Sequence, residues 1–256
     1  MAKRIKKRTQ PRTRHIPAQR VIDGWPEQAG TIRRIRPGEW ARANELLPAA
    51  GVQLDRSATT AIDNNTLGTV LLDGLATHIE GFHEHFLGSL KGQDLVQQLV
   101  PCSLVLVAED ASGQIIGVCE MIPPATTIMS MRSMGYPDVM AMMLAVTVGK
   151  VRGLAVDEDV RGQGWGSALL RRTMQVYDQL GFVALEGSFD VGSPHLEAFY
   201  RGHGFEVLDV GGKVQMDHLG PVVQIGSDDS ERMFVRHRDT SHLPWSQDLA
   251  RARREM

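Results

Sequence analysis

Three glycines alternate with other residues in the hexapeptide Arg161-Gly162-Gln163-Gly164-Trp165-Gly166, which directly precedes a stretch of helical periodicity. Glycine lets consecutive backbone amides point into one concavity because it has no Cβ. Such a nest at the positive end of a helix dipole binds phosphate oxygens. Arg161 adds a guanidinium at the mouth of the loop. The hexapeptide therefore predicts a pyrophosphate site, and an ordinary glycine-rich turn is the alternative.

Two common phosphate-binding motifs do not fit this loop. A P-loop requires a Lys after the glycines, and none follows here. A dinucleotide-binding fingerprint requires a third glycine at the position of Ser167. The pattern Arg-x-x-Gly-x-Gly between a strand and a helix resembles instead motif A of the GNAT superfamily of N-acetyltransferases, which grips the pyrophosphate of coenzyme A.

A second segment, Ser193 to Phe205, resembles motif B of the same superfamily. In that motif an Asn opens a helix, a Tyr follows, and Gly-Phe ends the unit. Tyr200 and Gly204-Phe205 stand at the matching positions, whereas Ser193 replaces the Asn with a shorter polar side chain. The resemblance is strong over about residues 150–210, and for 31–149 it rests on the order of elements.

The resemblance implies a donor site for acetyl-CoA that is built largely from backbone. In this superfamily the strand before the glycine loop separates from the strand after the next helix, and the pantetheine arm lies in the gap. Its amides bond to strand backbone, which also polarises the thioester carbonyl. The residues implied for acetyl-CoA binding are Leu154, Ala155, Val156, Arg161, Gly162, Gln163, Gly164, Trp165, Gly166, Ser167 and Ser193.

Acetyl transfer also needs an acid for the leaving thiolate and a base for the amine. Tyr200 matches the tyrosine of the superfamily that donates to the thiolate sulfur, with a core aromatic as the alternative. An amine with a pKa of about 10 must lose a proton near neutral pH. The candidate bases are Glu120, Glu186 and Asp190, with a water relay or a paired structural role left open for each.

The elements that position these residues follow from hydrophobic periodicity. Strands are predicted at 31–36, 103–108, 114–122, 150–156, 182–189, 205–210 and 232–237. Helices are predicted at 40–47, over most of 57–100, at 167–180 and at 193–203. This order predicts a mixed α/β (α+β) fold: a GNAT-like twisted mixed sheet flanked by helices, with splayed strands forming the CoA cleft.

The chain divides by composition into three parts. Residues 1–20 carry basic side chains and no acid, so residues 1–22 are predicted to be a disordered basic arm. The acetyltransferase domain is expected over 23–240, with a helical region at 57–100 and a methionine-rich insert at 125–149, and 241–256 is a peripheral tail. The insert favours core packing or a homodimer contact over a ligand lid.

Several classes are disfavoured by composition. No apolar run is long enough to cross a membrane, and the N-terminus lacks the apolar core of a secretory signal. The two cysteines, Cys102 and Cys119, form neither a disulfide framework nor a four-thiolate metal site. We therefore expect a cytoplasmic protein with no membrane contact and no metal.

Three functions fit these residues. The preferred one is an acyltransferase of the non-aminoacyl kind, an N-acetyltransferase that moves an acetyl group from acetyl-CoA to a primary amine of a small molecule or peptide by direct attack in a ternary complex. The second is acetylation of a macromolecular amine, on aminoacyl-tRNA or a protein, docked by the basic arm through RNA or another polyanion. The third is a non-catalytic acyl-CoA-binding regulatory module.

Overall fold

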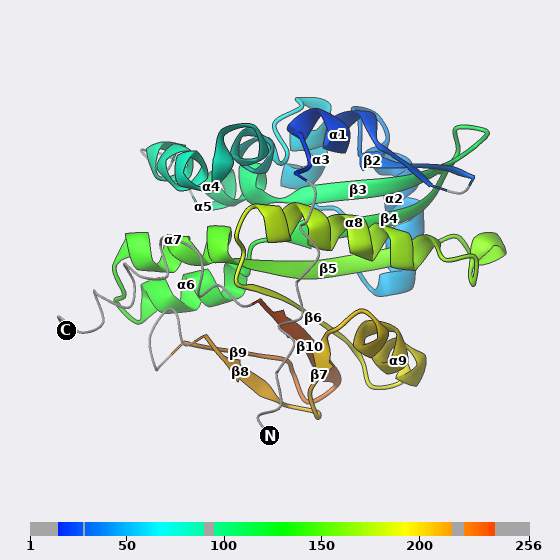
Figure 1. Cartoon of the computed structure of the whole chain (residues 1–256). Coiled ribbons are helices and arrows are strands. Elements are labelled where there is room, and N and C mark those ends of the chain that lie inside the picture. Colours follow the sequence, from blue (N-terminus) through cyan, green and yellow to red (C-terminus); the bar gives the residue numbers. More distant parts are fainter. Residues whose placement is uncertain (1–14, 28, 90–94, 217–222, 239–256) are drawn as a thin grey trace, which may run out of the picture.

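The computed structural model describes residues 15–27, 29–89, 95–216 and 223–238 (Figure 1). Its centre is an eight-stranded mixed sheet in the order β1-β2-β3-β4-β5-β6-β10-β7, and β8 and β9 form a separate two-stranded sheet. Among paired neighbours in the large sheet, β5 and β6 are parallel, and the other pairs are antiparallel. The strands are β1 (Trp25–Glu27), β2 (Gly30–Arg34), β3 (Leu104–Asp110), β4 (Ile115–Ile122), β5 (Val148–Val156), β6 (Ala184–Asp190), β7 (Glu206–Val207), β8 (Lys213–Gln215), β9 (Gln224–Gly226) and β10 (Glu231–His237).

Helices cover both faces of the sheet (Figure 1). The α-helices are α1 (Ala18–Asp23), α2 (Trp40–Leu46), α3 (Arg56–Asp63), α4 (Thr69–Ser89), α5 (Leu95–Leu99), α6 (Ala125–Ser133), α7 (Asp138–Thr147), α8 (Trp165–Gln179) and α9 (Pro194–Gly202). Short 3-10 turns are η1 (Leu47–Ala50), η2 (Val100–Cys102) and η3 (Glu158–Val160). None of the helices in the described ranges is long and apolar enough to cross a membrane.

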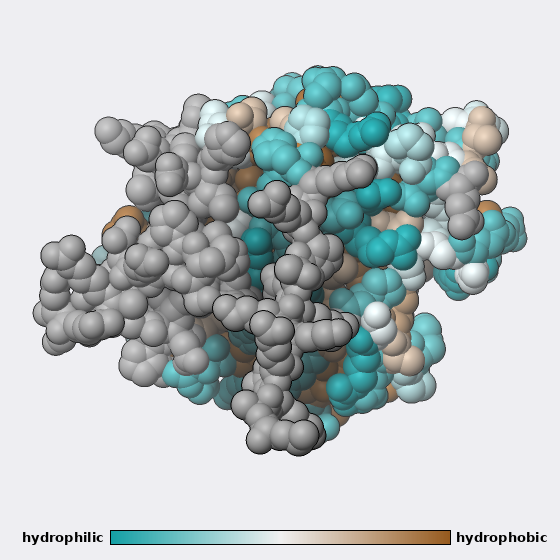
Figure 2. Space-filling model, viewed as in Figure 1, coloured by the Kyte–Doolittle hydropathy of each residue, from teal (hydrophilic) through white to brown (hydrophobic). Residues whose placement is uncertain are grey.

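The sheet separates two apolar cores. The larger core includes the buried face of α8, where residues such as Leu169, Thr173 and Val176 recur at helical spacing against β3, β4 and β5. The smaller core joins α2, η1 and α3 to the opposite face through Val105 and Val118. The outer surface over α8 is predominantly hydrophilic (Figure 2). The predicted mixed α/β architecture is confirmed.

Element boundaries differ in places from the sequence-based prediction. Helix α8 begins at Trp165, two positions before the predicted 167, because the glycine loop runs directly into the helix. Strand β3 continues through Asp110, two positions beyond the predicted end at 108. Strand β7 reaches only Val207 rather than 210. The methionine-rich insert forms α6 and α7, in which Met131 and Met142 are buried and Met129 and Met134 are exposed.

The prediction of disorder over residues 1–22 is wrong for its last part. Ile16 exchanges two hydrogen bonds with the side chain of Gln179 on α8, at 2.5 Å and 2.8 Å. Helix α1 then packs on β2 and α4, with Val21 fully buried. The buried side chains of Ile16 and Val21 therefore anchor this part of the basic segment. Residues 1–14 and the tail 241–256 lie outside the described residues.

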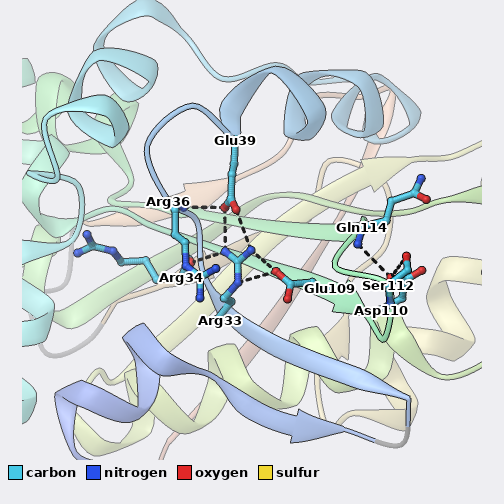
Figure 3. Close-up of polar contacts among 8 residues, drawn as sticks. All are labelled: Arg33, Arg34, Arg36, Glu39, Glu109, Asp110, Ser112 and Gln114. Atoms are coloured by element: carbon cyan, nitrogen blue, oxygen red, sulfur yellow. Dashed lines mark hydrogen bonds and ion pairs between the residues drawn. The ribbon is translucent and has the colours of Figure 1, made fainter.

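A buried guanidinium holds α2 against the sheet (Figure 3). Arg33 of β2 is 2% exposed and forms a bidentate pair with Glu39, at 2.8 Å and 2.7 Å, just before α2. Its Nε also donates to Glu109 of β3 at 2.9 Å. Both carboxylates face one cation, so each partner compensates the desolvation of the others. This pairing fixes the start of the α2, η1 and α3 layer that covers one side of the site.

Candidate functional site

Strands β5 and β6 separate partway along their length. They pair in parallel from Val148 with Ala184 to Val151 with Gly187, whereas β5 continues to Val156 and β6 to Asp190. Within the described residues, 153–156 of β5 pair with β4 on one side, and 152–156 pair with no strand on the other. The splay expected from the resemblance is present, and it leaves a free backbone edge beside α9 and the glycine loop.

A bulge in β5 lies where the two strands separate. The β4–β5 register passes from Glu120 opposite Gly153 to Met121 opposite Val151, so Arg152 is the additional residue. A Cβ on Gly153 would lie 2.6 Å from Val52 Cγ2 and 2.8 Å from a Leu47 methyl. The loop after η1 therefore packs directly on the bulge.

The backbone groups of the free edge can be assigned by alternation. The amide of Asp157 donates to the Ile116 carbonyl of β4 at 2.8 Å. Because backbone groups alternate in direction along a strand, those of Ala155 also point toward β4, and those of Leu154 and Val156 point toward the free edge. The Val156 carbonyl already accepts a bond from Arg161 Nε at 3.2 Å.

The glycine loop has the local geometry of an anion site. Gly162 and Gly164 have φ of 76° and 88°, and a Cβ on either would meet nothing within 4 Å. Gly164 is the N-cap of α8 and offers no side chain to the helix, whose first internal bond joins Ala168 N to the Gly164 carbonyl at 2.9 Å. The amides of Trp165, Gly166 and Ser167 thus have no acceptor within the helix.

Side chains around the loop divide into exposed and buried groups. Arg161 is about half exposed and donates to Glu158 at 3.1 Å. The Trp165 side chain is buried in the larger core, so only its backbone amide faces the loop. A Cβ on Gly166 would lie 3.7 Å from Val156 and 3.8 Å from Phe199 of α9. The loop, the free edge of β5 and α9 therefore adjoin one another.

Tyr200 lies on the buried side of α9. Its ring stacks on Phe234 with a centroid separation of 3.6 Å and lies 5.9 Å from Phe189. Burial raises the pKa of Tyr200, and the nearby Cys119 thiol adds to the shift. The hydroxyl is therefore protonated at neutral pH. Cys119 pairs with Leu154 in the β4–β5 register, so the tyrosine is associated with the segment of β5 that carries the free edge.

The start and end of α9 follow the expected pattern with one difference. Ser193 is the N-cap residue and Pro194 opens the helix, but the Ser193 side chain makes no capping hydrogen bond. Gly204, with φ of 83°, ends the helix, and the Phe205 amide donates to the Tyr200 carbonyl at 3.1 Å. The Ser193 hydroxyl therefore does not cap the helix that follows it.

The three candidate bases lie in different environments. Glu120 is 2% exposed, and burial raises its pKa to about 7, although Arg152 opposes that shift from 2.8 Å. Glu186 is 3% exposed, and burial raises its pKa to about 7 against the opposing charge of Lys150. Asp190 is exposed and accepts the Gly192 amide at 2.6 Å, in the turn after β6.

Glu120 and Tyr200 approach β5 from opposite faces of the sheet. Glu120 is opposite Val105, which belongs to the core beneath α2 and α3. Neighbouring Cys119, which influences Tyr200, points to the α8 face and lies 3.5 Å from the Thr173 hydroxyl. Glu120 and Tyr200, the candidate base and the candidate acid, thus lie on opposite faces of the strand segment at which β5 leaves β6.

Sequence reasoning missed the residues that surround Glu120. The sequence predicts Arg152 only as part of a strand and indicates no role for Gln53 or Asp55. Their involvement depends on the bulge and on a loop far away in sequence, and neither leaves a local signal.

In the described part of the chain, no group of three or more His, Cys, Asp or Glu residues is arranged to hold a metal ion.

Comparison with known proteins gives one family match. Residues 101–207 match the model of the acetyltransferase (GNAT) domain. This interval contains β3, β4, β5, α8, β6 and α9, together with the whole glycine loop. A search of curated proteins found no match. Domains of this family transfer acetyl groups from acetyl-CoA, so the match supports acetyl-CoA as the acyl donor.

Several solved structures are loosely similar. An acetyltransferase of Streptococcus agalactiae 2603 is 12% identical, with 83% of this chain and 100% of that chain covered and a TM-score of 0.45. A GNAT-family acetyltransferase of Staphylococcus aureus Mu50 is 12% identical, with 82% and 99% covered and a TM-score of 0.44. One from Elizabethkingia anophelis with acetyl-CoA bound is 14% identical, with 57% and 84% covered and a TM-score of 0.35. Likeness at this level does not extend to substrate or mechanism.

The family match and the splayed sheet agree on the same segment of the chain. The matched interval includes the strand that leaves its neighbour, the glycine loop and the helix that carries Tyr200. Residues 101–207 of this chain are therefore similar to a GNAT acetyltransferase domain.

Proposed function

We propose that this protein transfers the acetyl group of acetyl-CoA to a primary amine of a small molecule or peptide by direct attack in a ternary complex. The observation that carries the proposal is the free edge of β5, which leads into a glycine loop and a helix N-terminus with three amides that lack a helical acceptor. An extended amide-containing chain that ends in a pyrophosphate is complementary to both parts.

The donor fits this surface by hydrogen bonding to backbone. The pyrophosphate would accept bonds from the amides of residues 163–167, where open space at Gly162 and Gly164 lets phosphate oxygens approach. Arg161 lies at the mouth of the loop. The pantetheine amides would bond to Leu154 and Val156, whereas Ala155 contributes strand structure because its backbone groups point to β4.

Tyr200 is proposed as the acid. In the reaction the amine nitrogen attacks the thioester carbonyl carbon, the carbonyl oxygen gains the electron pair, and collapse breaks the C–S bond. The departing sulfur takes the Tyr200 proton, which bulk water later restores. A backbone amide at the free edge of β5 would stabilise the transient oxyanion. The raised pKa of Tyr200 keeps its proton available at neutral pH.

Glu120 is proposed as the base in preference to Glu186. Glu120 lies opposite Gly153, which is within the free edge of β5, whereas Glu186 lies opposite Lys150 in the segment where β5 and β6 still pair. A pKa of about 7 suits a group that must accept a proton from an ammonium near neutral pH and release it afterwards. Its burial favours the approach of a cationic amine, since ion pairing compensates desolvation.

The test is release of CoA thiol from acetyl-CoA in the presence of a broad panel of primary amines. Mass spectrometry of each mixture identifies the acetylated product. Amine-dependent thiol release with a matching N-acetyl product supports the proposal. Failure with every amine, while the protein binds acetyl-CoA, would instead favour a non-catalytic acyl-CoA-binding module.

A further inference from the structure

One guanidinium connects the proposed base to the opposite wall of the site. Arg152 is the additional residue of the β5 bulge, and its Nε donates to Oε2 of Glu120 at 2.8 Å. The same side chain donates through Nη2 to the Gln53 carbonyl, and its Nη1 lies 4.0 Å from Oδ2 of Asp55. The bulge thus directs Arg152 to the face on which Glu120 lies.

The loop that receives Arg152 is itself held firmly. Asp55 caps α3, because its Oδ1 accepts the Ala58 amide at 2.8 Å and the Ser57 hydroxyl at 2.5 Å. Asn44 of α2 accepts the Leu54 amide at 2.7 Å. The partners of Arg152 are therefore anchored to two helices rather than to the free edge of β5.

Glu120 has two carboxylate oxygens with different surroundings. Oε2 accepts the bond from Arg152, whereas Oε1 accepts no hydrogen bond from another described residue. A charge-assisted hydrogen bond to one oxygen restricts where that oxygen can lie. We propose that Arg152 is a positioning residue of the acyl transfer, which fixes Oε2 of Glu120 so that Oε1 is presented to the acceptor amine. This inference rests on the proposed function.

The charges around Glu120 make this role measurable. Arg152 stabilises the ionised form, and Asp55 destabilises it. Cys119 is the neighbouring titratable group and lies on the opposite face of the sheet from Glu120. Lys150 and Glu186 lie farther along the face that carries Glu120. Loss of Arg152 should therefore raise the pKa of Glu120, whereas loss of the Asp55 charge should lower it.

The experiment is the pH profile of kcat/KM for acetyl transfer with one amine that the wild-type full chain accepts. The variants are Arg152→Gln, Arg152→Lys and Asp55→Asn. Because the amine is the same throughout, its own titration is common to all profiles. We expect the midpoint of the limb near neutral pH to move up by roughly one to two pH units in Arg152→Gln and to move down in Asp55→Asn. The midpoint for Arg152→Lys should lie between those of Arg152→Gln and wild type.

Two outcomes overturn the inference. The first is a limb that stays in place in Arg152→Gln when its CoA affinity and melting temperature match those of wild type. The second is a shift of the limb in the same direction in Arg152→Gln and Asp55→Asn. If Arg152→Gln does not fold, Asp55→Asn decides alone, because Asn also caps helices, and an unmoved or raised limb overturns the inference. A wild-type protein without any transfer activity overturns the proposed function itself, and the role of Arg152 with it.

Discussion

Gly164 offers a direct test of the donor site, because the site requires the left-handed conformation of this residue. Its φ of 88° is left-handed, and a Cβ there meets nothing within 4 Å. In Gly164→Ala the exposed loop can relax to a right-handed conformation in the free protein, which turns the amides at the start of α8 away from the pyrophosphate. Binding must then restore the left-handed conformation, at about 1–2 kcal/mol for Ala.

This cost predicts that CoA binds about 5- to 30-fold more weakly to Gly164→Ala than to wild type. Isothermal titration calorimetry with CoA measures the change. Gly113→Ala is the matched control, because Gly113 has φ of 86°, equally open surroundings and a position in the β3–β4 hairpin. Gly113→Ala should leave CoA affinity unchanged. The reasoning is refuted if Gly164→Ala binds CoA like wild type, or if the two variants lose affinity equally.

Three further predictions concern the acid, a buried carboxyl and the buried ion pairs. Tyr200→Phe should lower kcat by roughly 10²- to 10⁴-fold and leave CoA affinity intact, because the stacked ring remains and only the proton donor is lost; an unchanged kcat in steady-state assays would exclude Tyr200 as the acid. Because burial raises the pKa of Glu186 to about 7, the folded chain holds more protons at this residue than the unfolded chain between about pH 4.5 and 7, so this contribution to stability should fall as pH rises through that range. Glu186→Gln should lack this fall. As pH rises from 5 to 8, its free energy of unfolding should therefore increase by on the order of 3 kcal/mol relative to that of wild type. A difference between the two unfolding free energies that is constant with pH would contradict this prediction. Arg33→Ala should cost about 3–5 kcal/mol in denaturant unfolding, because Glu39 and Glu109 lose their shared cation; a loss below about 1 kcal/mol would show that the pairs contribute little.

The parts of the site that were predictable are those with local signals. The glycine loop, the α9 boundaries at Pro194 and Gly204, and the hairpin before β5 each follow from short-range residue types. A left-handed glycine or a proline at the first helical position constrains the backbone wherever it occurs.

The surroundings of Glu120 were not predictable, because they join segments that are distant in sequence. Arg152 reaches Glu120 and Gln53 only because β5 contains a bulge, which depends on the register with β4. The basic composition of the N-terminal segment likewise gave no indication that Ile16 and Val21 would be buried. Tertiary packing decided both cases.

The position of bound acetyl-CoA tests the proposed function most directly. A crystal structure of the complex should place the pyrophosphate on the amides of residues 163–167 and the pantetheine along β5, bonded to Leu154 and Val156. The thioester sulfur should then lie within hydrogen-bonding reach of the Tyr200 hydroxyl. Acetyl-CoA bound away from the free edge of β5, or with its sulfur out of reach of Tyr200, would contradict the account.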